Sequence, residues 1–83
     1  MVNISNEKLV SLPYSIACEL LESKIRSLNL QIEQILKKWN QVDIETFQEA
    51  TKRGELPEAE TDAIIVGNLS AKLVEYEKLY QNL

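Results

Sequence analysis

Apolar residues in the first half of the chain recur with the spacing of one helix face. From Tyr14 to Val42 they follow one another in alternating steps of four and three, and the positions between them are mostly polar. This pattern is typical of a helix that packs along one narrow stripe. It predicts a helix over about residues 12–40, in which Pro13 is tolerated because the first turn needs no N–H there. The stripe comprises Tyr14, Cys18, Leu21, Ile25, Leu28, Ile32, Ile35, Trp39 and Val42.

A second stripe with the same spacing lies near the end of the chain. It consists of Val66, Leu69, Leu73, Tyr76, Tyr80 and Leu83. It predicts a helix over about residues 58–82, whose start is marked by Pro57 and by acidic residues near the positive end of the helix dipole. Gly67 lies inside this helix at a cost of about 1 kcal/mol relative to alanine. Either a neighbouring backbone approaches Gly67 or the helix bends there.

The segment between the two stripes carries its own start and stop signals and predicts a short helix over about residues 44–53. Asp43 is its N-cap, and Val42 and Phe47 have the spacing of a hydrophobic staple. Gly54 ends the helix, and Leu56 is placed to fold back as the apolar contact that accompanies a glycine C-cap. The elbow residues Asp43, Phe47, Gly54 and Leu56 therefore predict an ordered connection.

Two narrow stripes joined by an ordered elbow predict an all-α fold. We expect one domain over residues 1–83, an antiparallel hairpin of two long helices with a short elbow helix. One helix pairing buries too little apolar surface to offset the ordering of the chain, so a partner is needed. The commonest solution is homodimerisation into a four-helix bundle. The expected hairpin or dimer seam is Cys18, Leu21, Ile25, Leu28, Ile32, Ile35, Trp39, Val66, Leu69, Leu73, Tyr76 and Tyr80.

Further apolar residues lie outside the two stripes. Leu12, Ile16 and Leu20 form a second stripe on the first helix, and Ile65 and Val74 lie off the stripe of the last helix. We interpret these five residues as a partner-binding surface. Two other interpretations stay open, because the same residues are also suited to complete a homodimer or to cover the elbow helix.

Charge is distributed unevenly along the 83 residues. The chain has 13 acidic and nine basic residues, and residues 43–62 alone hold seven acids and two bases. This balance opposes binding to nucleic acid or to an anionic membrane, whereas it suits a basic protein partner. The longest uninterrupted apolar run is Ala63–Val66, and no signal segment precedes the first helix. We therefore expect no membrane span and a cytoplasmic location.

The residue types present exclude most catalytic chemistry. The chain has no histidine and one cysteine, so His-dependent triads, the usual zinc sites and an internal disulfide are all excluded. Cys18 lies on the seam and is expected to be a buried apolar residue. Two acidic pairs at helical spacing, Glu19 with Glu22 and Glu58 with Asp62, are expected to form solvated faces. We predict no enzyme activity, no metal and no cofactor.

The elbow sequence also resembles a known family. It runs from Val42 through Phe47 to a turn of Arg53-Gly54-Glu55-Leu56, followed by an acidic stretch from Glu58 to Asp62. This layout is similar to that of short helical-hairpin, antitoxin-like proteins encoded beside small toxins in prokaryotic toxin–antitoxin modules. After Asp62 that family usually has an aromatic residue, whereas this chain continues Ala63-Ile64-Ile65.

The resemblance implies a non-enzymatic interaction module, antitoxin-like or accessory, that restrains a partner such as a small toxin by covering it with a helical surface. Two alternatives remain. The chain is also suited to be a self-associating structural bundle without another partner. In addition, Gly-Glu-Leu-Pro followed by a helix is similar to the small helical subunit of exodeoxyribonuclease VII, which implies a subunit of a nuclease complex.

Overall fold

The computed structural model describes residues 13–83, and the regular secondary structure of this part of the chain consists of helices alone. Helices account for 83% of these residues, with no strand among them. The elements are α2 (Tyr14–Lys38), α3 (Ile44–Lys52), a 3₁₀ turn η1 (Pro57–Ala59) and α4 (Glu60–Gln81). The all-α prediction is confirmed. The predicted position Leu12 lies outside the described residues.

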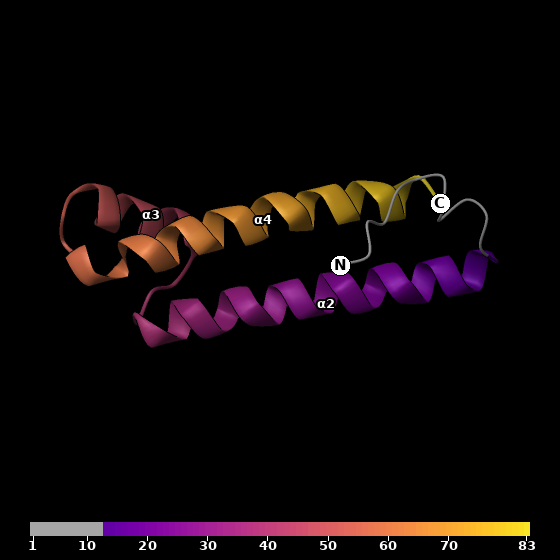
Figure 1. Cartoon of the computed structure of the whole chain (residues 1–83), viewed down its shortest axis with the longest axis horizontal. Coiled ribbons are helices and arrows are strands. Elements are labelled where there is room, and N and C mark those ends of the chain that lie inside the picture. Colours follow the sequence, from indigo (N-terminus) through magenta and orange to yellow (C-terminus); the bar gives the residue numbers. More distant parts are fainter. Residues whose placement is uncertain (1–12) are drawn as a thin grey trace.

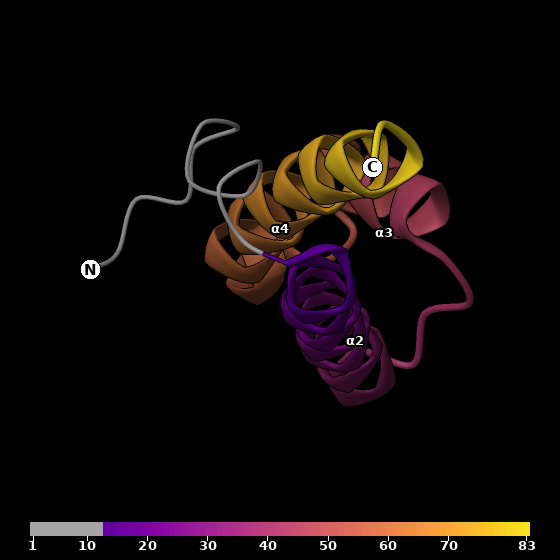
Figure 2. The same ribbon diagram turned by 90° about the vertical axis from the view of Figure 1, so that its right-hand side faces the viewer.

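The two long helices lie side by side and run in opposite directions (Figure 1). The molecule measures 47 × 22 × 17 Å along its principal axes. Seen from the end, α3 packs against α4 on one side of the pair (Figure 2). The pair thus has a closed end at the elbow, and an open end where α2 begins and α4 terminates.

The first long helix ends earlier than predicted because the backbone reverses at Asn40. This residue adopts a left-handed conformation with φ 54°. Its N–H donates to the Lys37 carbonyl at 3.2 Å, and the Gln41 N–H donates to the Leu36 carbonyl at 2.9 Å. The two bonds form a Schellman motif, in which asparagine takes the position that glycine usually fills. The helical hydrogen bonding of α2 therefore stops at Lys38 rather than at Asn40.

Side-chain and backbone caps hold both ends of α3. The Thr46 N–H donates to Asp43 Oδ1 at 2.7 Å, which caps the first turn. At the other end Gly54 has φ 76°. The Gly54 N–H donates to the Thr51 carbonyl at 3.1 Å, and the Glu55 N–H donates to the Ala50 carbonyl at 3.0 Å. These two bonds form a second Schellman motif. These caps fix where the chain enters and leaves α3.

The predicted hydrophobic staple between Val42 and Phe47 is wrong. The Val42 side chain is 86% exposed, whereas Phe47 is fully buried. Phe47 packs instead against Ala59, Ala63 and Val66. The C-terminal reversal of α2 carries Val42 to the surface, so the stripe of α2 ends in the core at Trp39. Tyr14, at the other end of that stripe, is also exposed.

The core consists of two clusters joined along the helix pair. The closed-end cluster contains Phe47, Ala59, Ala63 and Val66, with half-buried Ile35, Leu36, Trp39, Ile44 and Leu56 around it. The open-end cluster contains Ala17 and Leu21, packed by Tyr76, Leu79, Tyr80 and Leu83. Leu28 and Ile32 are buried between them. Each residue of the expected seam is buried or half-buried.

Gly67 marks a close approach between α3 and α4. A Cβ atom at this position would lie 3.1 Å from the Gln48 side-chain nitrogen, and α4 continues through the position without interruption. The sequence left open whether a neighbouring backbone approaches Gly67. The close neighbour is instead a side chain of α3. Any larger residue at Gly67 requires the Gln48 amide to move.

Candidate interaction surfaces

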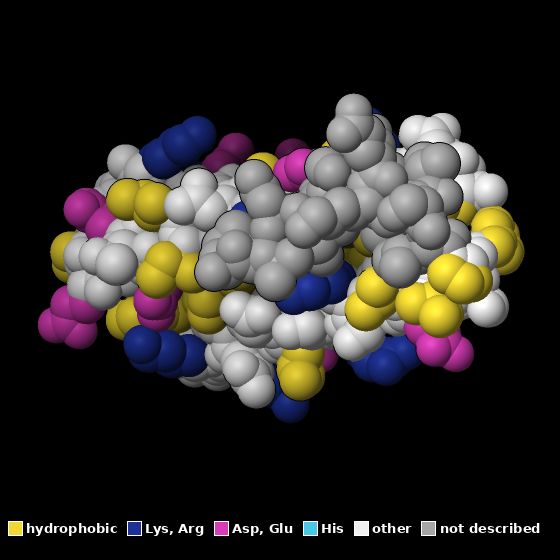
Figure 3. Space-filling view, turned by 45° about the vertical axis from the view of Figure 1, so that its right-hand side comes forward, with side chains coloured by type: hydrophobic (Ala, Val, Ile, Leu, Met, Phe, Trp, Pro, Cys, Tyr) yellow, Lys and Arg dark blue, Asp and Glu magenta, His cyan; other side chains and the backbone are white. Residues whose placement is uncertain are grey.

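Apolar side chains are exposed at the open end of the helix pair. On α2, Ile16 is 45% exposed and Leu20 is 42% exposed. Leu79 and Leu83 lie at the same end, half-buried against Ala17 and Leu21. Hydrophobic side chains gather at this end in the space-filling view, on the right (Figure 3). We call Ile16 and Leu20 the open-end patch.

The structure does not bring the predicted partner-binding residues onto one surface. Ile65 and Val74 are both exposed on α4. They are nine residues apart, about two and a half helical turns, so they lie on opposite sides of that helix. Ile65 is near the closed end, far along the axis from the open-end patch. The predicted set therefore divides into separate surfaces, and Leu12 is not among the described residues.

A hollow of about 630 Å³ lies between α2, the start of α3 and the middle of α4. We call it the elbow groove. Its apolar lining is Ile32, Leu36, Val42 and Ile44, and its polar lining is Asp43, Glu45, Gln48 and Ser70. The most exposed large apolar side chain in the described chain, that of Val42, stands at its edge.

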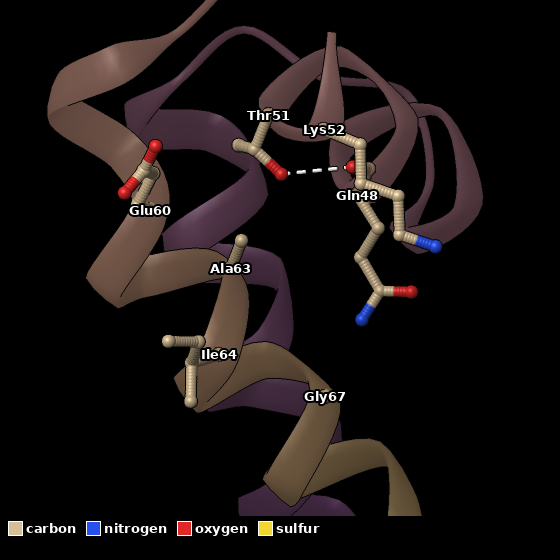
Figure 4. Close-up of a pocket in the computed structure, with 7 residues that line it drawn as sticks. All are labelled: Gln48, Thr51, Lys52, Glu60, Ala63, Ile64 and Gly67. Atoms are coloured by element: carbon tan, nitrogen blue, oxygen red, sulfur yellow. Dashed lines mark hydrogen bonds between the residues drawn. The ribbon is translucent and has the colours of Figure 1, made fainter. Parts of the chain in front are cut away.

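A second hollow of about 480 Å³ lies on the other side of α3 (Figure 4). Gln48 extends from α3 toward Gly67, and the Thr51 hydroxyl donates to the Gln48 carbonyl at 2.8 Å. Lys52 and Glu60 both line this hollow, so its charges are mixed. Its large apolar lining residue is Ile64 alone, whereas four large apolar residues line the elbow groove.

Asp62 fastens the end of α2 to the first turn of α4. Its Oδ2 accepts hydrogen bonds from Trp39 Nε1 at 2.8 Å and from Lys38 Nζ at 3.0 Å. The bonds from Trp39 and Lys38 hold the pKa of the carboxyl below its ordinary value. The sequence predicted that Asp62 belongs to a solvated face. The bonds to Trp39 and Lys38 show instead that its carboxylate joins two helices. Its contribution to stability is present above the pKa of an unfolded aspartate and is lost as the pH falls through the folded pKa.

Tyr80 makes the corresponding polar contact near the open end. Its hydroxyl donates to Glu22 Oε1 at 2.5 Å, joining α4 to α2. This hydrogen bond, with partial burial and the carboxylate charge, raises the pKa of Tyr80 to about 12. The acidic pair Glu19 and Glu22 is thus also not purely a solvated face, because Glu22 bonds across the helix pair.

Tyr80 is expected to ionise near pH 12. Because the folded pKa lies above the unfolded value of 10.0, its contribution to stability is present below pH 10 and lost as the pH rises toward 12. Absorbance at the tyrosinate wavelength, followed during an alkaline titration, measures the steps. Tyr80→Phe should remove the step near pH 12, and Glu22→Gln should shift it to lower pH. A step that stays near pH 12 in Glu22→Gln would contradict this assignment.

No group of three potential metal-ligating side chains occurs among residues 13–83. The Cys18 thiol is free and half-buried on the seam. Every helix within residues 13–83 is too short or too polar to cross a membrane.

Sequence reasoning missed the small residues of the core and the bridging role of Asp62. Four alanines are buried, although the stripes predicted from the sequence contain no alanine: Ala17, Ala50, Ala59 and Ala63. Ala17 and Ala63 do lie at helical spacing from Leu21 and Val66, which is the signal that would have found them. Gln48 and Ser70, which line the elbow groove, carry no such signal.

No protein-family model, curated protein or solved structure matches the chain. The functional interpretation therefore rests on the surfaces and charges of the chain itself.

Proposed function

We propose that the chain is a small non-enzymatic protein–protein interaction module, in which α2 and α4 act as a helical hairpin and bind a partner through helical surfaces. The observation that supports this most directly is the open-end patch, where Ile16 and Leu20 are both more than 40% exposed. Exposed apolar side chains that adjoin one another mark interaction sites more often than isolated ones do.

The energetics of the core favour the same conclusion. Nine hydrophobic residues are buried in the described chain, and four of them are alanines. Full burial of a Leu or Ile side chain contributes about 1.5–3 kcal/mol, and the open-end patch forgoes part of this in the isolated chain. A partner that covers Ile16 and Leu20 recovers that contribution at the open-end cluster, which holds two buried residues within the described part of the chain.

The kind of partner follows from charge and from the resemblance of the elbow sequence. Residues 43–62 carry an excess of five acidic groups, seven against two. A basic protein is attracted to such a surface, and a small nuclease-type toxin is one example. In this proposal the chain is antitoxin-like, acts in the cytoplasm and restrains its partner by covering it.

Self-association is the second candidate. The open-end patch lies on one long helix of a two-helix layer, so the same patch of a second copy is able to cover it around a twofold axis. The product is a homodimeric four-helix bundle. This candidate differs from the first in one respect, because it needs no other protein.

The double variant Ile16→Glu/Leu20→Glu tests the proposed function. It places two carboxylates in the patch, while Gln34→Glu adds one charge on the same helix about 21 Å from Leu20 and serves as the control. Each chain is affinity-purified from its native host with quantitative mass spectrometry. Analytical ultracentrifugation of the purified chain at micromolar concentration gives its own association state. Far-UV circular dichroism verifies that the helix content is unchanged.

The wild type and Gln34→Glu are expected to retain one companion protein in a fixed ratio. The double variant should lose it by at least about 100-fold, because an unpaired buried carboxylate costs several kcal/mol. Retention of the companion by a folded double variant would overturn the assignment of this patch. A purified wild type that is dimeric, a monomeric double variant and no companion would establish self-association instead.

A further inference from the structure

The short helix α3 covers only part of one side of the long helix pair. It has nine residues against the 22 of α4, which amount to about 13 Å and 33 Å of helix. The N-terminal end of α3 faces the middle of α4, where Ile44 and Glu45 share the elbow groove with Ser70. Among residues 13–83, the position of a third helix is thus filled near the closed end, and no described helix extends it beyond Ile44.

The elbow groove has the dimensions and lining that suit a helix. Its α2 wall is formed by Ile32 and Leu36, which are one turn or about 6 Å apart. Ser70 is the residue of α4 that lines the groove, and Val42, which is 86% exposed, and Ile44 complete its apolar lining. A helix with apolar side chains at i and i+4 matches the spacing of Ile32 and Leu36, which is how amphipathic helices occupy grooves.

The charged residues that line the elbow groove are of one sign, and Lys37 lines the hollow next to it. Asp43 and Glu45 line it, and none of its described lining residues is a lysine or arginine. A hydrogen bond from the Thr46 backbone lowers the pKa of Asp43, so this carboxylate remains ionised at neutral pH. Elsewhere in the elbow, Arg53 is already paired with Glu55 at 2.7 Å and with Glu49 at 3.5 Å. The excess negative charge of the groove therefore remains available to a partner.

We propose that the elbow groove binds a short amphipathic helix of a partner protein, which continues the line of α3 and carries Lys or Arg in its last turn. Its apolar side chains pack against Leu36, Val42 and Ile44. Its basic residues lie opposite Asp43 and Glu45. The C-terminal end of that helix then faces the N-terminus of α3, so the two helix dipoles are aligned head to tail. The inference rests on the proposed function, because both treat the chain as an interaction module, but it concerns a different surface.

The test uses the full chain, labelled with ¹⁵N, and two synthetic helical peptides. Both peptides have leucines on one face, and one has lysines in its last turn where the other has glutamates. Two variants of the chain form a matched pair, Val42→Asn in the groove and Leu30→Asn on the outer side of α2, since both residues are exposed. A third variant, Glu45→Lys, reverses the charge at the edge of the groove. Amide chemical shifts report the binding position and the dissociation constant.

The lysine peptide is expected to bind at least about tenfold more tightly than the glutamate peptide, with shifts concentrated at Val42, Ile44 and Ser70. Val42→Asn should weaken binding about fivefold or more, and Leu30→Asn should leave it unchanged. Glu45→Lys should reduce or reverse the preference between the peptides.

Equal affinities of the two peptides would overturn the inference, as would an absence of binding or shifts confined to the open-end patch. Shifts of the groove residues on dilution of the chain alone would identify a second copy as the occupant, which also overturns it. Failure of the proposed function is recognised separately. In that case the Ile16→Glu/Leu20→Glu variant keeps its companion whatever the peptides do.

Discussion

Phe47→Ala is expected to lower the free energy of unfolding of the chain by about 3–5 kcal/mol. Phe47 is the largest fully buried side chain, and the other fully or nearly fully buried residues of the closed-end cluster, Ala59, Ala63 and Val66, are too small to fill the space it leaves. Domains of this kind are stable by only about 5–15 kcal/mol in total. Urea unfolding followed by far-UV circular dichroism measures the loss.

Leu30→Ala is the control for Phe47, because Leu30 is 54% exposed on α2. It should cost less than about 1 kcal/mol. An unfolding midpoint of Phe47→Ala that equals the midpoint of this control would show that α3 contributes little to the stability of the helix pair.

Leu21→Ala is expected to cost about 2–5 kcal/mol, with an effect that begins at the open end. Leu21 and Ala17 are the only buried members of the open-end cluster among the described residues. Leu28 and Ile32 lie between this cluster and the cluster around Phe47, so the substitution should release the start of α2 and the end of α4 before α3. Amide hydrogen exchange resolves the order of opening.

The adjacent Leu20→Ala provides the control, because Leu20 is 42% exposed and lies outside the cluster. It should change exchange rates little. If Leu21→Ala accelerated exchange equally in α3 and at the open end, the two clusters would behave as one cooperative unit, and the expected local opening would be wrong.

These two predictions bear on the proposed function. The open-end patch lies at the smaller of the two described clusters, so binding at Ile16 and Leu20 should stabilise the part of the chain that opens most readily. A partner that binds only the folded form adds stability in proportion to RT ln(1 + [L]/Kd), which is about 2.7 kcal/mol at a hundredfold excess over Kd.

The helical periodicity of the sequence was enough to predict the long helices and their inner faces. Positions such as Leu21, Leu28 and Val66 recur at the spacing of a helix stripe, and burial requires the same spacing. The N-cap Asp43 and the reversal at Gly54 were also predictable, because each depends on a local property of one residue type.

Features that depend on the meeting of distant segments were not predictable in this way. Asp62 lies 23 residues from Trp39, and no local pattern indicates that its carboxylate accepts the indole N–H. The exposure of Val42 follows from the left-handed Asn40, a conformation that asparagine tolerates but seldom signals. The elbow groove likewise exists only because α3 folds back along α4.

The order of elements along the chain has a consequence for its synthesis. α2 is translated first, and the residues that cover its apolar stripe lie in α4. About 45 residues follow Lys38, so translation at roughly 5–20 residues per second leaves the apolar stripe of α2 exposed to solvent for about 2–9 s. The elbow is the first region whose segments are all available, and the helices then close from there toward Tyr14 and Gln81. The surroundings of Ile16 and Leu20 are consequently the last part of the helix pair to form, so their partner is expected to bind chains in which α4 is already complete.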